Sequence, residues 1–216
     1  MPGKSTRNKY THRNQSHTNQ NGESVEGIRV NNWKVTSGPS TEPVTATEAK
    51  LHCKVDNTAD DALFTILIQA AREYVEQYCN IALVTETITE YFDAFPAGDV
   101  LTLSVSPLQT VTSITYVDSA GATQTLSSGL YNVDTAHQPA RAFLDEGQTW
   151  PETYGQRNCI TVVYTAGFGA AAAVPAKLKL ALLMSIAERY NNRQDGPKTY
   201  RTAVEVLLDD YKIRRW

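Results

Sequence analysis

Two glycines near residue 168 have the spacing of a nucleotide-binding turn. Gly167, Gly169 and Ala172 form Gly-x-Gly-x-x-Ala between a run rich in β-branched residues and a long apolar run. In a dinucleotide-binding turn such glycines let the backbone approach a pyrophosphate at the start of a helix. That turn opens a parallel βαβ unit, whereas here β-rich runs precede it, Pro175 follows closely, and no second strand comes after the helix. We therefore interpret the glycines as a joint between a sheet edge and a helix.

Other chemical motifs are also missing from the sequence. It contains no P-loop, no Gly-x-Ser-x-Gly and no His-Glu-x-x-His. The four histidines and three cysteines do not have metal-ligand spacings, and widely separated cysteines in odd number fit a reducing compartment. We expect no enzyme activity, no catalytic residue, no metal and no cofactor. A nucleotide enzyme built on Gly167 and Gly169 is the least favoured function.

The composition is that of a soluble protein that is not a general nucleic-acid-coating protein. The chain has 216 residues, 41% hydrophobic and 20% charged, with a net charge of −3. A protein needs concentrated positive charge to displace counterions from nucleic acid, whereas the net charge of this chain is negative. No apolar run has the length of a membrane span, and the N-terminus lacks an apolar signal segment. We expect no membrane contact.

Residues 1–40 are predicted to form an extended polar and basic arm. Asn, Gln, Ser and Thr dominate residues 1–27, which cannot bury enough apolar surface to offset the entropy of ordering. A short strand is expected around Trp33–Val35. The arm orders on a protein neighbour, which we favour, contacts DNA phosphates with a marked salt dependence, or is a passive solubilising tail. The candidate contact residues are Lys4, Arg7, Lys9 and Arg13.

Two helices are predicted in residues 41–83. Thr45 and Glu48 form a capping box that starts the first. The second begins after Asn57 or Thr58 as its N-cap. Its apolar residues recur at i, i+3, i+4 and i+7 and form one stripe: Leu63, Ile66, Leu67, Ala70, Ala71, Tyr74, Val75 and Tyr78.

Phe64 and Ile68 lie beside this stripe and widen the apolar arc of the second helix. One explanation is deep burial in its own domain. The other is a contact with a neighbouring subunit, which makes Phe64 and Ile68 candidate interface residues.

Residues 84–170 change to short runs rich in Val, Ile, Thr, Tyr and Phe. No helical pattern separates them, so antiparallel pairing is expected, with a hairpin turn at "DSAGAT". Residues 171–216 return to helix. The first helix there is apolar in nearly every direction, which predicts burial on all sides, and Leu180 and Met184 are further candidate interface residues. A short helix and the tail "YKIRRW" complete the chain.

The predicted fold class is α+β. Two N-terminal and two C-terminal helices form a bundle, into which an antiparallel β subdomain is inserted.

Three stretches give the chain a resemblance to a known family. "PVTATEAKLHCKVD", "DDALFTILIQAAREYVEQYCNIAL" and "YTAGFGAAAAVPAKLKLALLMSIAERYNNR", with the strand run "VTSITYVD" between them, resemble the head–tail connector (adaptor) proteins of tailed bacteriophages, in the longer form with a β insertion. The resemblance covers roughly residues 41–195. It implies a non-enzymatic virion protein, made in the host cytoplasm and located at the neck between head and tail.

The resemblance also implies partners. Members form a ring, commonly of twelve copies, beneath the portal vertex, and extend the channel through which genomic DNA passes without sequence-specific contacts. The ring contacts the portal protein on one side and a head–tail stopper or tail protein on the other. An acidic body suits such a channel, because like charge keeps DNA from sticking.

The C-terminal tail is the candidate portal-docking element, since related adaptors reach the portal with this segment and Trp, Tyr and Arg are enriched at binding hot spots. The residues are Tyr211, Lys212, Ile213, Arg214, Arg215 and Trp216. The alternative function is a nucleic-acid-binding DNA-packaging factor that uses the basic arm.

Overall fold

The computed structural model of the chain describes residues 32–192 and 202–213. They belong to one compact unit that begins at Asn32. The candidate arm contacts Lys4, Arg7, Lys9 and Arg13 lie outside the described residues.

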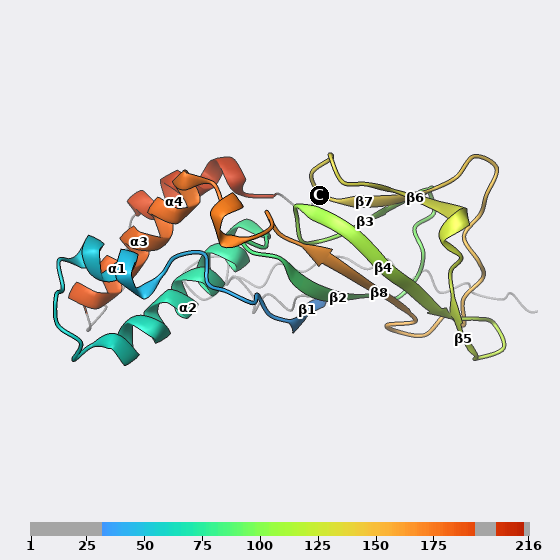
Figure 1. The fold of residues 1–216 in the computed structure, drawn as a ribbon. Helices are drawn as coiled ribbons and strands as arrows, with labels where there is room; N and C mark the ends of the chain where they lie inside the picture. Colours follow the sequence, from blue (N-terminus) through green and yellow to red (C-terminus); the bar gives the residue numbers. More distant parts are fainter. Residues whose placement is uncertain (1–31, 193–201, 214–216) are drawn as a thin grey trace, which may run out of the picture. The chain divides into compact units, whose positions relative to one another are not determined.

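The described residues form an α+β fold, as predicted, with four α-helices and two antiparallel sheets (Figure 1). The helices are α1 (Ala46–Cys53), α2 (Asp61–Cys79), α3 (Ala176–Asn191) and α4 (Ala203–Leu208), which a 3₁₀ turn (Asp209–Tyr211) extends. Apolar faces of all four helices surround one core. The helices that come first and last in the chain therefore build one bundle.

Side-chain caps fix where two of these helices begin. Thr45 accepts from the N–H of Glu48, and Glu48 accepts from the N–H of Thr45, so the predicted capping box is confirmed. Thr202 and Glu205 repeat the arrangement at α4. The predicted cap of α2 is wrong. Its N-cap is Asp60, because Asn57 uses its side chain on the N–H of Ala59 in the preceding turn.

The predicted β region contains the expected strands, and "DSAGAT" forms the hairpin between two of them. One sheet has the order β1-β2-β8-β4-β5 and the other β3-β7-β6. The strands are β1 (Trp33–Ser37), β2 (Glu86–Phe92), β3 (Val100–Thr102), β4 (Leu108–Val117), β5 (Thr123–Thr125), β6 (Tyr131–Asp134), β7 (Arg141–Leu144) and β8 (Ile160–Ala166). All named pairs are antiparallel.

A second apolar core lies between the two sheets. Alternate residues of the central strand β8 point into it, namely Ile160, Val162, Tyr164 and Ala166. Leu101 and Ala142 enter it from the three-stranded sheet. The alternation of β8 thus places every second side chain in the core.

The Gly167 turn joins the two cores. The N–H of Phe168 donates to the carbonyl of Leu83 at 3.2 Å, and the N–H of Thr85 donates to that of Gly169 at 3.0 Å. Gly167 has φ +128°, and a Cβ there would lie 2.5 Å from the carbonyl oxygen of Val84. Only glycine fits this approach, which is between two backbone segments rather than toward a ligand.

Candidate assembly surfaces and pocket

The buried face of α2 differs from the predicted stripe. Phe64 and Ile68 are buried in the subunit's own core, where the ring of Phe64 stacks on Tyr190 at 4.9 Å between centroids. Ile66, a member of the predicted stripe, is 64% exposed. The structure therefore corrects the two candidates Phe64 and Ile68: they fill the bundle and have almost no surface left for a neighbour.

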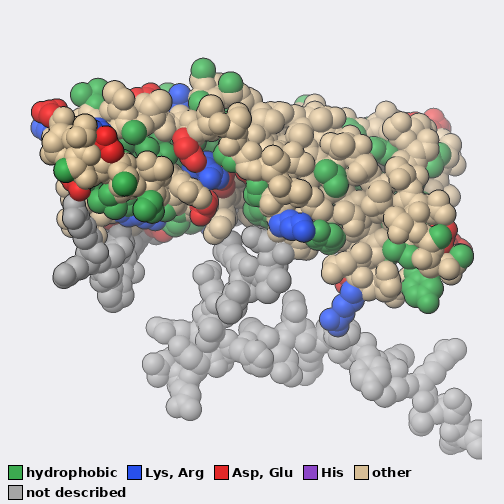
Figure 2. Space-filling view, turned by 60° about the horizontal axis from the view of Figure 1, so that its bottom comes forward, with side chains coloured by type: hydrophobic (Ala, Val, Ile, Leu, Met, Phe, Trp, Pro, Cys, Tyr) green, Lys and Arg blue, Asp and Glu red, His purple; other side chains and the backbone are tan. Residues whose placement is uncertain are grey.

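For α3, the predicted burial on all sides is wrong. Leu178, Leu182 and Ile186 are buried, but the helix also has an outward side. Leu180 is 45% exposed there, and Met184 is half-buried against the edge of the core. These two remain candidates for a subunit contact. Figure 2, in which the lower side of Figure 1 and with it the side of α2 comes forward, shows hydrophobic side chains grouped on the helical part.

The described part of the tail is attached to the end of α2. The N–H of Ile213 donates to the carbonyl of Cys79 at 2.9 Å, and the Asn80 side chain donates to the carbonyl of Ile213 at 3.1 Å. Ile213 is buried, and the ammonium of Lys212 lies 4.2 Å from the ring centroid of Tyr78. Ile213 is therefore an internal anchor, which corrects its predicted role as a docking residue.

The other tail residues divide into two groups. Tyr211 and Lys212 are partly exposed, and Tyr211 packs against the bundle core. Arg214, Arg215 and Trp216 lie outside the described residues.

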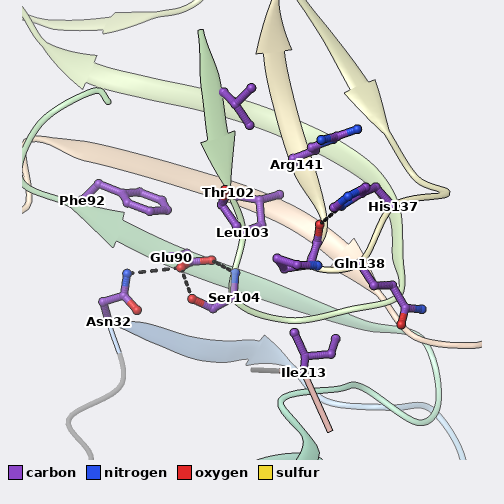
Figure 3. Close-up of a pocket in the computed structure, with 12 residues that line it drawn as sticks. Asn32, Glu90, Phe92, Thr102, Leu103, Ser104, His137, Gln138, Arg141 and Ile213 are labelled. Carbon is purple, nitrogen blue, oxygen red and sulfur yellow. Dashed lines mark hydrogen bonds between the residues drawn. The ribbon is translucent and has the colours of Figure 1, made fainter. Parts of the chain in front are cut away.

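A pocket of about 520 Å³ opens where the tail meets the β subdomain (Figure 3). Asn32, β2, β3 with the segment after it, residues 137–141 and Ile213 line it. Glu90 lies at its base with no exposed surface. Strand alternation explains this position, because Glu90 shares the core side of β2 with Ile88.

Four groups donate to the carboxylate of Glu90. The N–H of Ser104 and the hydroxyl of Tyr164 each donate to Oε2 at 2.9 Å. The amide of Asn32 donates to Oε1 at 3.1 Å, and the hydroxyl of Ser104 also donates to Oε1. Burial raises the pKa of Glu90, and these donors oppose the rise. The carboxylate thus connects the residue before β1, the segment after β3 and strand β8. Its role in the fold is structural.

The remaining polar groups of the pocket bond elsewhere. Arg141 pairs with Asp134, with Nε 3.0 Å and Nη2 2.8 Å from Oδ2. His137 Nδ1 lies 3.1 Å from the carbonyl oxygen of Pro139, as Figure 3 shows. Neither side chain is bonded to Glu90, so these three groups do not form an acid–base pair.

A second group of charges has three buried members, Arg72, Glu76 and Glu86. Arg72 Nη1 is 2.8 Å from Glu76 Oε2, and Arg72 Nε is 2.9 Å from Glu42 Oε2. Glu86 is also buried, and its Oε2 has no hydrogen-bond partner among the described residues. Burial, reinforced by Glu76, raises the pKa of Glu86 to about 8, so it is largely protonated at neutral pH.

Sequence reasoning missed the acids Glu76, Glu86 and Glu90. A signal existed for two of them, since period-2 alternation in "ETITEYF" places Glu86, Ile88 and Glu90 on one face. Among the described residues, no group of three or more His, Cys, Asp or Glu side chains could hold a metal ion. No helix in that part of the chain is long and apolar enough to cross a membrane.

A bundle closed by the first and last helices, with β strands inserted, is the architecture expected for a head–tail connector. Residues 44–117, which run from just before α1 to the end of β4, match the family described as phage gp6-like head-tail connector protein. The resemblance expected from the sequence is thus confirmed. No curated protein matches the chain.

Solved structures with the same fold come from a phage-like particle. A chain of the neck of an empty gene transfer agent (GTA) particle, computed with C6 symmetry, aligns with TM-score 0.72 and 24% identity. A chain of the native GTA virion aligns with TM-score 0.71 and 24% identity. One from the neck of the native particle, computed with C12 symmetry, has TM-score 0.67 and 26% identity. Each comparison covers 85% of this chain and 96% of the other.

Proposed function

We propose that this protein is a head–tail connector that forms a ring in the neck of a phage-like particle, beneath the portal vertex. The observation that carries the proposal is the alignment with the neck chain in the C12-symmetric structure, which spans nearly all of that chain. The match of residues 44–117 to the connector family supports it independently. The ring extends the path of the genomic DNA and presents a surface to the next tail protein.

The distribution of charge suits that role. The first 30 residues hold five basic and two acidic side chains, while the whole chain has a net charge of −3. The folded body is therefore more acidic than the chain as a whole. A channel wall of this sign repels the phosphates of passing DNA, so the DNA slides without being retained.

The portal-docking role is proposed for the end of the tail. Because Ile213 is hydrogen-bonded to Cys79 and Asn80, it fixes the end of the described tail, and Arg214, Arg215 and Trp216 follow it in the sequence. Two cations and an indole are typical hot-spot residues. Tyr211 and Lys212 contribute the partly exposed surface beside them.

Cross-linking with mass spectrometry on purified particles tests the proposal. Lys212 and the arm residues Lys4 and Lys9 supply the reactive amines. Links from Lys212 to a portal protein, together with links between copies of this chain, are expected. Absence of the chain from the particles would contradict the connector function.

The packaging-factor alternative predicts different behaviour. A protein that grips DNA through Lys4, Arg7, Lys9 and Arg13 binds DNA in isolation, and the affinity falls steeply with salt. A connector binds DNA weakly or not at all. Titration of labelled duplex DNA at low and high salt separates the two, with the chain lacking residues 1–31 as the matched control.

A further inference from the structure

The outward side of α3 is an apolar row without a charged residue. Leu180, Leu183, Met184 and Ala187 recur at helical spacing and all keep exposed surface, while Leu183 and Met184 also pack against the edge of the subunit's own core. Leu180 is the most open of the three large side chains in the row, at 45% exposure. Water-facing helix positions are normally polar, so this row fits a protein contact.

The first half of α2 has a second apolar surface on its outward side, and the exposed polar residues Gln69, Glu73 and Gln77 continue that side toward the end of the helix. Ala62 and Ile66 are exposed on it, and Leu63 and Ala70 are half-buried beside them. Ile66 is 64% exposed. The predicted stripe therefore mixes residues of the buried face, such as Ala71 and Val75, with residues of this outward surface, such as Ile66.

The two surfaces lie on opposite sides of one core. Phe64 and Ile68 of α2 and Leu178 and Leu182 of α3 fill the same cluster of buried residues. The sides of α2 and α3 that face away from that core therefore point in different directions, with α2 below and α3 above in Figure 1. One copy cannot bring its own two surfaces together.

Two unlike surfaces on one subunit give a head-to-tail contact. A single self-complementary surface makes a two-fold dimer, whereas two complementary surfaces make a ring when the rotation closes. The charges beside the two surfaces are also opposite: the exposed acid next to Ile66 on α2 is Glu73, and Lys179 flanks the row on α3. Asp61 and Lys177 are paired within the subunit, with Lys50 and Asp210.

We infer that the outward surface of α2 in one copy, centred on Ile66, packs against the outward surface of α3 in the next copy, centred on Leu180. This contact rests on the proposed function, since it is the contact by which the ring closes. It replaces Phe64 and Ile68 by Ile66 as the α2 partner of Leu180 and Met184.

Paired cysteines in assembled particles test the contact. The variant carries Ile66→Cys and Leu180→Cys, with Cys53→Ser because Cys53 is the partly exposed native thiol. After treatment with a short bis-maleimide, the double variant is expected to give a ladder of covalent oligomers on a denaturing gel. Each single-cysteine variant is expected to stay monomeric, because a head-to-tail contact places unlike residues opposite each other.

Two outcomes would overturn the inference. One is a double variant that enters particles but forms no ladder. The other is a single variant that forms dimers, which indicates a two-fold contact. If the unaltered chain is absent from particles, the proposed function itself fails, so the two failures are distinguishable.

A charge scan gives a second readout. Ile66→Asp and Leu180→Asp are each expected to lower incorporation into particles at least tenfold. Because both positions are exposed, the melting temperature of the free subunit should stay within about 3 °C of the parent. Leu51→Asp on α1 is the matched control: it is 77% exposed and lies on neither surface. Equal losses for all three variants would contradict the contact.

Discussion

Arg72 and Glu76 form an ion pair one helical turn apart inside the bundle, with both side chains buried. The second carboxylate oxygen of Glu76 accepts the N–H of Leu83 at 3.0 Å. The pair therefore connects the middle of α2 with the segment that leads into the sheet.

Removing one partner of this pair is expected to destabilise the fold strongly. Arg72→Met leaves the charges of Glu76 and Glu42 uncompensated, at a cost of roughly 3–5 kcal/mol in the free energy of unfolding. Adding Glu76→Gln should recover part of the loss. Urea unfolding measures both variants. The control is Lys50→Met, which breaks the more exposed pair with Asp61 and should lower the free energy of unfolding by at most about 1 kcal/mol. Equal losses of stability for the two pairs would refute the argument.

Glu86 gives the stability of the subunit a pH dependence of defined sign. Its folded pKa of about 8 lies above the ordinary value of 4.5, so the folded state binds a proton that the unfolded state releases. Stability from this group is complete below pH 4.5 and is lost as the pH rises toward 8.

Glu86→Gln should flatten that slope. The variant is expected to exceed the parent at pH 8 by on the order of 1–3 kcal/mol and to differ little near pH 4.5. Some slope of the same sign remains, because burial also raises the pKa of Glu76 and Glu90. Thermal unfolding between pH 4.5 and 8.5 checks this. An unchanged slope in the variant would show that Glu86 ionises freely in the fold.

The Glu90 network is expected to be sensitive to loss of its acceptor. Glu90→Leu leaves the N–H of Ser104 and the hydroxyl of Tyr164 without the carboxylate, and should lower the free energy of unfolding by about 2–4 kcal/mol. Thr102→Ala, an exposed change in the same pocket, should alter it by less than about 0.5 kcal/mol. Chemical denaturation compares them, and similar values would argue against a structural role for the acid.

Even the smallest side chain at position 167 is expected to destabilise the fold. Gly167→Ala places a methyl group against the backbone of Val84 and strains a φ of +128°, which should cost roughly 2–4 kcal/mol. Gly98→Ala is the matched control, since nothing lies within 4 Å of its added Cβ. The melting temperatures of the two variants test this, and a mild effect at Gly167 would mean that the joint can shift.

Tail truncations should separate stability from docking. Removing residues 211–216 deletes the buried anchor Ile213, so it is expected to destabilise the bundle as well as weaken portal attachment. Removing only residues 214–216 should leave the melting temperature within about 3 °C of the parent and still reduce attachment. Particle incorporation and thermal unfolding are measured together. Normal attachment without residues 214–216 would remove the docking role.

Local patterns predicted the order of elements because each one follows from neighbouring residues. The Thr45–Glu48 box and the alternation in "CITVVYTAGF" need no knowledge of the rest of the chain. The joint at Gly167 could be inferred for the same reason, from the elements on either side of it.

Local patterns could not predict which side of α2 is buried, or that Ile213 in the tail is an internal anchor. A helix apolar on two sides has two possible buried faces, and packing against α3 selects the one that holds Phe64. Ile213 is similar: its burial depends on the carbonyl of Cys79, more than a hundred residues earlier. Both outcomes depend on contacts that sequence periodicity does not contain.

The chain enters and leaves the β subdomain at neighbouring points, because Leu83 and Thr85 are hydrogen-bonded to Phe168 and Gly169. Among the described residues, the link between β1 and α1 adds a third crossing. Loops at the other end of the strands can therefore change length without moving the helices. The exposed turn at Gly121 is a suitable insertion point for an affinity tag or a fluorescent label, which would mark each subunit in an intact particle while the bundle stays in place.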